Sequence, residues 1–216
     1  TPEAYRAFEE YTQLFTHYGI PVLANFYNRI RIGVMPIGIG GYTEYLMLTT
    51  AAPELAGRWN IAPIPGRLRN DGVIDRSVGG IAGEADIILS RTLEPEASWE
   101  FLKWWLSTDI QTEFGREIEA IIGTEARWNS ANIEAFSQAN WNPEHLDVIR
   151  AQWEWARDIP NVLGGYFTAR HINNAWNRVV LGNQNVRSSL EEAVQDINKE
   201  LRMKQEEYNR LPPVQE

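Results

Sequence analysis

The residues best suited to catalysis or metal binding are few and scattered along this chain. Its three histidines, His17, His145 and His171, are far apart, and none has the HExxH spacing that places two ligands on one helix face. Cysteine is absent, which removes thiolate nucleophiles, disulfides and sulfur-based metal sites. We therefore expect no metal and no cofactor.

Carboxylates and glycines also fail to form a catalytic motif. Glu117 and Glu119 are two positions apart on a predicted helix, so they point to different sides and cannot flank one glycosidic bond. The run from Gly38 to Gly41 lacks the dinucleotide-binding pattern because Thr43 stands at its last glycine position. The sequence contains neither a nucleophile elbow (GxSxG) nor a phosphate-binding loop. These patterns favour a protein that is not an enzyme.

Two tyrosines, Tyr42 and Tyr45, follow a predicted strand and the break formed by Gly40 and Gly41. Side chains that emerge at the end of a strand line the crevice in which α/β proteins bind ligands. A ligand contact and a structural role fit these tyrosines equally well.

A second aromatic group stands at the start of a predicted helix, directly after two glycines. It combines Tyr166, Phe167, Arg170 and His171, and this set of two rings, a guanidinium and an imidazole can stack on and hydrogen-bond a polyol. A capped helix with a structural arginine explains the same residues, so both interpretations stay open.

Nine tryptophans make the chain unusually aromatic. Trp99, Trp104 and Trp105 belong to one predicted helix, and Trp153 and Trp155 belong to another. At helical spacing such side chains are more often buried in a core than displayed to a ligand. We therefore predict that most of them pack inside the protein.

Charge and composition narrow the class of protein. A formal net charge of −9 argues against nucleic acid as a partner, because phosphate binding needs an excess of Lys and Arg. No apolar stretch approaches the roughly 18 residues that span a membrane. The first residues, TPEAYRAFEE, carry neither an initiator Met nor a signal-peptide pattern, so we expect the chain to be part of a longer one.

The periodicity of apolar residues predicts a helix-rich α/β chain. Helices are expected from residue 2 to near 19, over 43–48 and 95–106, from 108, from 142 to before 160, after the glycine pair at 164–165, and from 188 or 189. A capping box is expected from Thr108 to Gln111, and the last helix should bury a stripe formed by Leu190, Val194, Ile197 and Leu201. Strands are expected within 28–39, 59–62, 75–81 and 85–89, with a polar turn at 66–72.

Several motifs occur in a characteristic order. They are NRIRIGVMPIGI at 28–39, WNIAPIPG at 59–66, SVGGIAGEADIIL at 77–89, EASWEFLKWWLSTD at 96–109, GGYFTARH at 164–171 and LEEAV at 190–194. In this order they resemble the C-terminal portion of extracellular solute-binding proteins of ABC transporters, the family 1 proteins related to maltose-binding protein. The resemblance covers nearly the whole chain, and the motif at 96–109 is its most specific element.

The resemblance implies a two-lobed, periplasmic-binding-protein-like fold of type II, with the ligand between lobes that close by a hinge. Residues 1–75 would supply a helix and strands of the C-terminal lobe, and residues 76–135 would supply crossing strands and helices that pack on the absent N-terminal lobe. Residues 136–210 would add further helices of the C-terminal lobe, and 211–216 would be a disordered tail. Exposed apolar helix faces would favour self-association.

The resemblance also implies a bacterial carbohydrate-binding component of an ABC importer. It would bind a sugar or oligosaccharide in the extracellular or periplasmic space and deliver it to the permease, anchored through a lipoprotein signal that this sequence does not contain. By position, Tyr42, Tyr45 and the segment from Tyr166 to His171 would contact the sugar. Glu84, which follows the return strand, would line the cleft.

Two other functions remain open. A glycan-active hydrolase could use the same aromatic surface with Glu44, Glu84 or Asp86 as acid and base. A sensory or scaffold domain could keep the fold without taking part in transport.

Overall fold

The structure is a computed structural model that describes residues 1–79, 85–157 and 162–210. The described chain is helix-rich and contains a small two-stranded sheet. It divides into two compact units, one formed by residues 1–24 and 160–216 and the other by residues 25–159. Each unit is described by itself.

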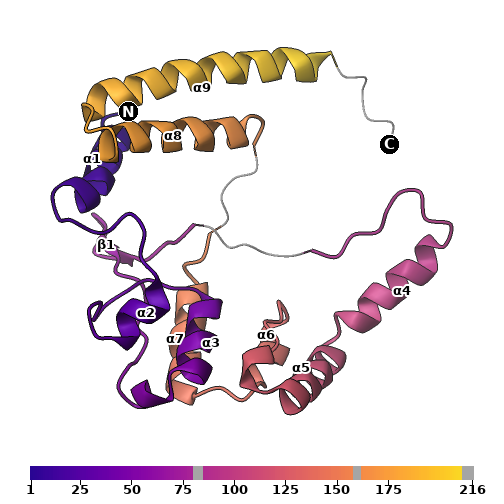
Figure 1. The fold of residues 1–216 in the computed structure, drawn as a ribbon. Helices are drawn as coiled ribbons and strands as arrows, with labels where there is room; N and C mark the ends of the chain where they lie inside the picture. Colours follow the sequence, from indigo (N-terminus) through magenta and orange to yellow (C-terminus); the bar gives the residue numbers. More distant parts are fainter. Residues whose placement is uncertain (80–84, 158–161, 211–216) are drawn as a thin grey trace. The chain divides into compact units, whose positions relative to one another are not determined.

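The unit formed by residues 1–24 and 160–216 consists of α1 (Pro2–Thr16), α8 (Gly165–Val180) and α9 (Val186–Asn209). The helices α8 and α9 lie side by side, and α1 packs against both (Figure 1). Asn185 caps α9, because its Oδ1 accepts hydrogen bonds from the backbone N–H of Arg187 at 2.9 Å and of Ser188 at 3.1 Å.

The core of this unit is small and lies where the three helices meet. It contains Phe8 from α1, Ala175 and Val179 from α8, and Ala193 from α9. The small side chains of Ala175 and Ala193 are fully buried and allow α8 and α9 to approach closely. Trp176 of α8 packs against the same core.

The unit formed by residues 25–159 holds shorter elements. They are α2 (Phe26–Arg31), α3 (Tyr42–Ala51), η1 (Pro53–Leu55), β1 (Arg67–Leu68), β2 (Ile74–Asp75), α4 (Pro95–Trp105), α5 (Thr108–Ile122), η2 (Thr124–Ala126), α6 (Ile133–Ser137) and α7 (Pro143–Trp153). The strands β1 and β2 form an antiparallel hairpin, with Arg67 opposite Asp75 and Leu68 opposite Ile74.

Most of the predicted helices are confirmed. The structure contains α1, α3, α4, α5, α7, α8 and α9 where helical periodicity predicted them. Asn142 caps α7 as expected, through hydrogen bonds from the N–H groups of Glu144 and His145. The last helix begins at Val186 instead of Ser188 or Ser189, because Asn185 supplies the cap.

The strand predictions are largely wrong for the described residues. Residues 28–31 belong to α2, because Asn25 caps a helical turn by accepting the N–H of Asn28 at 2.8 Å. No strand forms over 32–39, 59–62 or 85–89, and only Ile74–Asp75 and an isolated bridge from Val78 to Ala156 represent the segment at 75–79. Alternating apolar residues make a strand only where a partner backbone accepts its hydrogen bonds, and these segments lack one in the described structure.

The predicted turn at 66–72 is partly a strand. Arg67 and Leu68 form β1, and the turn that follows is closed by a 3.0 Å hydrogen bond from the N–H of Gly72 to the carbonyl of Arg69. Gly72 has a φ of 82°, a conformation that glycine adopts without strain. Residues 80, 81 and 211–216 lie outside the described residues.

Burial also differs from the prediction at several aromatic and apolar positions. On α4, Trp99, Phe101 and Trp104 are 55%, 57% and 52% exposed, so they do not form a core in this structure. On α9, Val194 is 45% exposed, and Ala193 takes its place in the buried face. The apolar surface of α4 is the kind that favours association, but self-association stays a prediction.

Membrane-spanning helices and the division into lobes were also considered in the sequence. No helix of the described chain has both the length and the apolar composition that crossing a membrane requires. The assignment of residues 1–75, 76–135 and 136–210 to parts of two lobes stays a prediction.

We predict that Phe8→Ala destabilises the unit of α1, α8 and α9 by about 3–5 kcal/mol, because Phe8 is the largest side chain in its core. Hydrogen exchange of peptides from α8 and α9 should then be correspondingly faster. Tyr11→Ala is the control, since Tyr11 lies on the same helix and is 51% exposed. Equal exchange in the two variants would contradict this description of the core.

Candidate functional site

Tyr42 and Tyr45 lie in the first turns of α3. This helix begins at Gly41, where the side chain of Glu44 accepts the Gly41 N–H at 2.9 Å. At Gly40 a Cβ atom would come within 3.0 Å of the Glu44 Cβ. Glycine therefore allows the backbone before α3 to pass close to the first turn of the helix. The prediction that the two tyrosines follow a strand is therefore wrong, and Glu44, a candidate acid or base, serves as a helix cap.

The two tyrosines belong to an aromatic cluster, which we call the Tyr45 cluster. It consists of Tyr42, Tyr45, Trp59, Trp141 and His145. The ring of Tyr45 lies 5.6 Å from Trp59, 5.4 Å from Trp141 and 5.5 Å from His145, measured between ring centroids. These are the separations at which aromatic rings attract one another.

Hydrogen bonds occupy both phenol groups of the cluster. The Tyr42 hydroxyl donates to the carbonyl of Arg127 at 2.6 Å, and a 2.9 Å hydrogen bond joins the Tyr45 hydroxyl to Nδ1 of His145. Burial raises the pKa of Tyr42 to about 12, although the nearby Arg127 acts in the opposite direction. Burial likewise raises the pKa of Tyr45, so both phenols are neutral at physiological pH.

A buried ion pair lies beneath the Tyr45 cluster. The side chains of Arg127 and Glu119 are only 4% and 16% exposed. Arg127 donates from Nη2 to Oε1 of Glu119 at 2.7 Å and from Nε to Oε2 at 3.1 Å. The guanidinium also lies 5.0 Å from the ring of Trp141. The cluster thus rests on a paired charge, and its polar groups are used within the protein.

Tyr166 and Phe167 lie in the first turn of α8, and both are accessible. Tyr166 is 74% exposed, and its ring centroid lies 5.5 Å from that of Phe167. Two cations flank Phe167, since the Arg170 guanidinium is 5.0 Å and the Lys204 ammonium is 5.6 Å from its ring centroid. Cations at this range are attracted to the ring face.

These aromatic residues line a hollow of about 580 Å³, formed by residues 162–167 and Tyr208. Gly164 has a φ of 77°, and a Cβ there would lie 2.4 Å from the Leu201 Cδ2. Only glycine fits this turn without strain, so Gly164 fixes how α8 begins against α9. The hollow is wide and apolar enough to accept one face of a ring-shaped ligand.

Arg170 and His171 are directed differently from the two rings. Arg170 lies 3.9 Å from Glu200 and His171 lies 3.6 Å from Asp196, so both contact α9. The side chain of His171 is only 13% exposed, and neither residue lines the hollow. The structural interpretation therefore accounts for His171, whereas Arg170 also contacts the ring of Phe167.

The structure places the predicted site residues in two separate groups. Tyr42 and Tyr45 belong to the unit of residues 25–159, and the segment from Tyr166 to His171 belongs to the other unit. Glu84 lies outside the described residues. Asp86 is described and exposed.

Sequence reasoning missed several members of these groups. Trp59, Trp141 and His145 join the tyrosines, and no helical spacing signals this, because Trp59 and Trp141 lie outside the helices. Tyr208 lines the hollow because α8 and α9 form an antiparallel pair joined by a short connection. Such a connection predicts that residues near the end of α9 return to the start of α8.

Comparisons with known proteins add no family to these observations. Neither a scan against protein-family models nor a search of curated proteins found a match to the chain. Among the described residues, no group of three or more His, Asp or Glu side chains is arranged to hold a metal ion.

We predict that Glu119→Ala destabilises the unit of residues 25–159 by about 3–5 kcal/mol, because it leaves the Arg127 charge buried and unpaired. Urea unfolding measures the change. Glu117→Ala, at an exposed position on the same helix, should change stability by no more than about 0.5 kcal/mol. A loss below about 1 kcal/mol in Glu119→Ala would show that Arg127 does not depend on this partner.

The Tyr45 cluster should also make stability depend on pH. Burial lowers the pKa of His145 below its ordinary value of 6.5, with Glu144 opposing the shift. The unfolded chain therefore takes up a proton at a higher pH than the folded chain, and stability is lost as pH falls through 6.5. Urea unfolding of the wild type and His145→Gln between pH 7.5 and 5 should show a weaker pH dependence in the variant. Identical slopes would mean that His145 does not titrate differently on folding.

Proposed function

We propose that the chain is a carbohydrate-binding part of a solute-binding protein that serves an ABC importer. The protein works outside the cell membrane, in the extracellular or periplasmic space, and hands a sugar or oligosaccharide to the permease. The observation that carries the proposal is the hollow at the start of α8, where Tyr166 and Phe167 present accessible rings.

Sugar chemistry fits this hollow. A pyranose ring has an apolar face of C–H groups that packs on an aromatic ring, and hydroxyls at its edge that need hydrogen-bond donors and acceptors. Tyr166 and Tyr208 offer exposed aromatic surface together with phenol groups, and both are lining residues. Arg170 and Lys204 lie against the ring of Phe167 and place positive charge near the hollow, although neither lines it.

The order of sequence motifs supports the same function. The segment 164–171 that forms the hollow is one of the motifs that resemble the family 1 solute-binding proteins. In this proposal the chain forms part of a two-lobed protein whose hinge closes over the ligand, and it releases the ligand chemically unchanged. The Tyr45 cluster has a structural role in this proposal, since its two hydroxyls already have partners within the protein.

The experiment is titration calorimetry of the chain with a panel of α- and β-linked di-, tri- and tetrasaccharides. We expect saturable binding of at least one of them, and chromatography of the mixture should recover that saccharide intact. Heats that stay at the level of dilution across the panel would overturn the proposal, and cleavage products would replace it with a hydrolase.

The double variant Tyr166→Ala, Phe167→Ala should weaken this binding at least about tenfold, since burying one aromatic ring stabilises a complex by more than the 1.4 kcal/mol that a tenfold change represents. Tyr18→Ala is the matched control, because Tyr18 belongs to the same unit and is 69% exposed. Equal affinity in the double variant and the control would move the site away from α8.

A further inference from the structure

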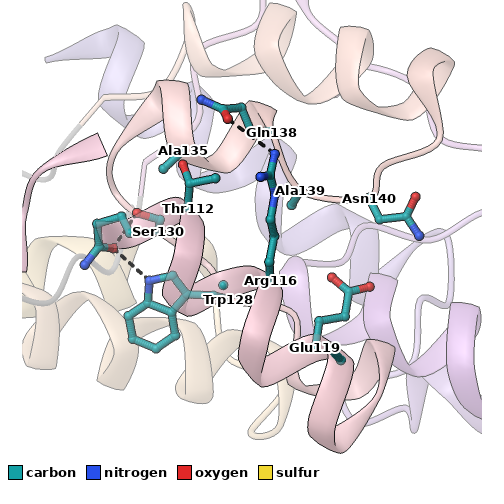
Figure 2. Close-up of a pocket in the computed structure, with 12 residues that line it drawn as sticks. Thr112, Arg116, Glu119, Trp128, Ser130, Ala135, Gln138, Ala139 and Asn140 are labelled. Atoms are coloured by element: carbon teal, nitrogen blue, oxygen red, sulfur yellow. Dashed lines mark hydrogen bonds between the residues drawn. The ribbon is translucent and has the colours of Figure 1, made fainter. Parts of the chain in front are cut away.

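A groove of about 450 Å³ lies between α5 and α6, in the unit of residues 25–159 (Figure 2). We call it the α5–α6 groove. Its volume lies in the range of about 300–1,000 Å³ that is common for small-molecule sites. None of the residues that the sequence singled out as ligand contacts lines it.

Small residues on both helices make room for the groove. Gly115 and Ala120 of α5 face it, and so do Ala135 of α6 and Ala139, which follows α6. A larger side chain at any of these positions would reduce the space between the helices. The hollow therefore follows from the choice of residues at the helix surfaces.

The floor of the groove is polar, buried and held in one arrangement. Oε1 of Gln111 accepts hydrogen bonds from Trp128 Nε1 at 2.8 Å and from Ser130 Oγ at 2.7 Å, while its Nε2 donates to the carbonyl of Trp105 at 2.9 Å. Gln111 and Ser130 are only 5% and 7% exposed. A site whose polar groups are already oriented loses little entropy when a ligand binds.

Thr112 has hydrogen-bonding capacity that the protein does not use. It is 8% exposed, and its Oγ1 has no hydrogen-bond partner among the described residues. Leaving a buried hydroxyl unpaired costs about 1–3 kcal/mol, so native proteins seldom do so without a reason. The oxygen itself is covered by its neighbours, so a ligand in the groove can reach it only if the side chain turns.

The charges on the groove favour an anion. Glu119 lines it, but its carboxylate is already paired with Arg127. Arg116 projects along the groove in Figure 2, and its hydrogen bond to Oε1 of Gln138 is long at 3.5 Å. None of the described carboxylates lies within 4.0 Å of the Arg116 guanidinium. The charge of Arg116 is therefore available to a ligand.

The geometry points to a binding site for a small hydroxy-carboxylate in the α5–α6 groove. The planar guanidinium of Arg116 matches a carboxylate with two parallel hydrogen bonds. The side-chain amides of Gln138 and Asn140 line the same groove and can bond ligand hydroxyls. The small alkyl walls accept the carbon skeleton. The site is independent of the hollow at α8 and does not rest on the proposed function.

Titration calorimetry of the chain with glucuronate, with glucose and with acetate tests this assignment. Glucose has the hydroxyls without the carboxylate, and acetate has the carboxylate without the hydroxyls. We expect saturable binding of glucuronate and at least about tenfold weaker binding of each of the other two. Equal affinity for glucuronate and glucose, equal affinity for glucuronate and acetate, or no saturation by glucuronate would overturn the inference.

Two variants and a control locate the binding. Arg116→Gln removes the charge and should weaken glucuronate binding at least about tenfold, and Ala120→Leu should do the same by filling the groove while keeping a good helix former. Arg150→Gln, at an exposed position on α7, should leave the affinity unchanged. Circular dichroism checks that each variant is folded. Binding that survives Arg116→Gln and disappears in the Tyr166→Ala, Phe167→Ala variant would overturn the groove site and leave the proposed function standing.

Discussion

The buried charge of Arg127 constrains the arrangement of the unit formed by residues 25–159. An arginine side chain that is only 4% exposed is tolerated only with a charged partner, and Glu119 of α5 provides it. The backbone carbonyl of Arg127 accepts the hydroxyl of Tyr42 from α3, and its guanidinium lies against Trp141 before α7. Two helices, α3 and α5, and the segment before α7 therefore converge on one residue. Because Glu119 also lines the α5–α6 groove, the same ion pair supports the groove and the Tyr45 cluster.

The two aromatic groups show why residue type alone does not identify a ligand surface. In the Tyr45 cluster the phenols are half-buried and hydrogen-bonded to His145 and to the backbone, so the rings mainly stabilise the unit. Tyr166 also has an aromatic neighbour, Phe167, but it remains 74% exposed and lines a hollow. Solvent accessibility therefore distinguishes aromatic residues that stabilise the fold from those that can bind a ligand. It depends on tertiary packing, which the sequence indicates only indirectly.

Helices were predictable from the sequence because their signals are local. Pro143 after Asn142 marked α7, and the spacing of apolar residues marked α1, whose Phe8 is buried as a helical stripe requires. The strands were not predictable in this way. Residues 28–31 have the alternating pattern of a strand, but they belong to a helix that Asn25 caps. A strand depends on a distant partner, and no local pattern supplies one.

In the candidate sites, too, residues marked by local signals could be predicted and residues brought together by distant contacts could not. Tyr166 and Phe167 could be singled out from their place after two glycines. Tyr208, which lines the same hollow, is distant in sequence and is brought there by the pairing of α9 with α8. Gln111 shows the limit most clearly. Its position suggested a capping partner of Thr108, yet its side chain turns inward and orients Trp128 and Ser130. Tertiary hydrogen bonds outweighed the local motif.

The discontinuity of the unit that contains α1 has a consequence for biosynthesis. Its first helix leaves the ribosome before its two partners, and residues 25–159 are made in between. At common synthesis rates this interval is on the order of ten seconds, far longer than a helix needs to form. During that time Phe8 lacks the residues of α8 and α9 against which it packs. The unit of residues 25–159 is continuous and can begin to fold as it emerges. The chain should therefore acquire its structure from the middle outward.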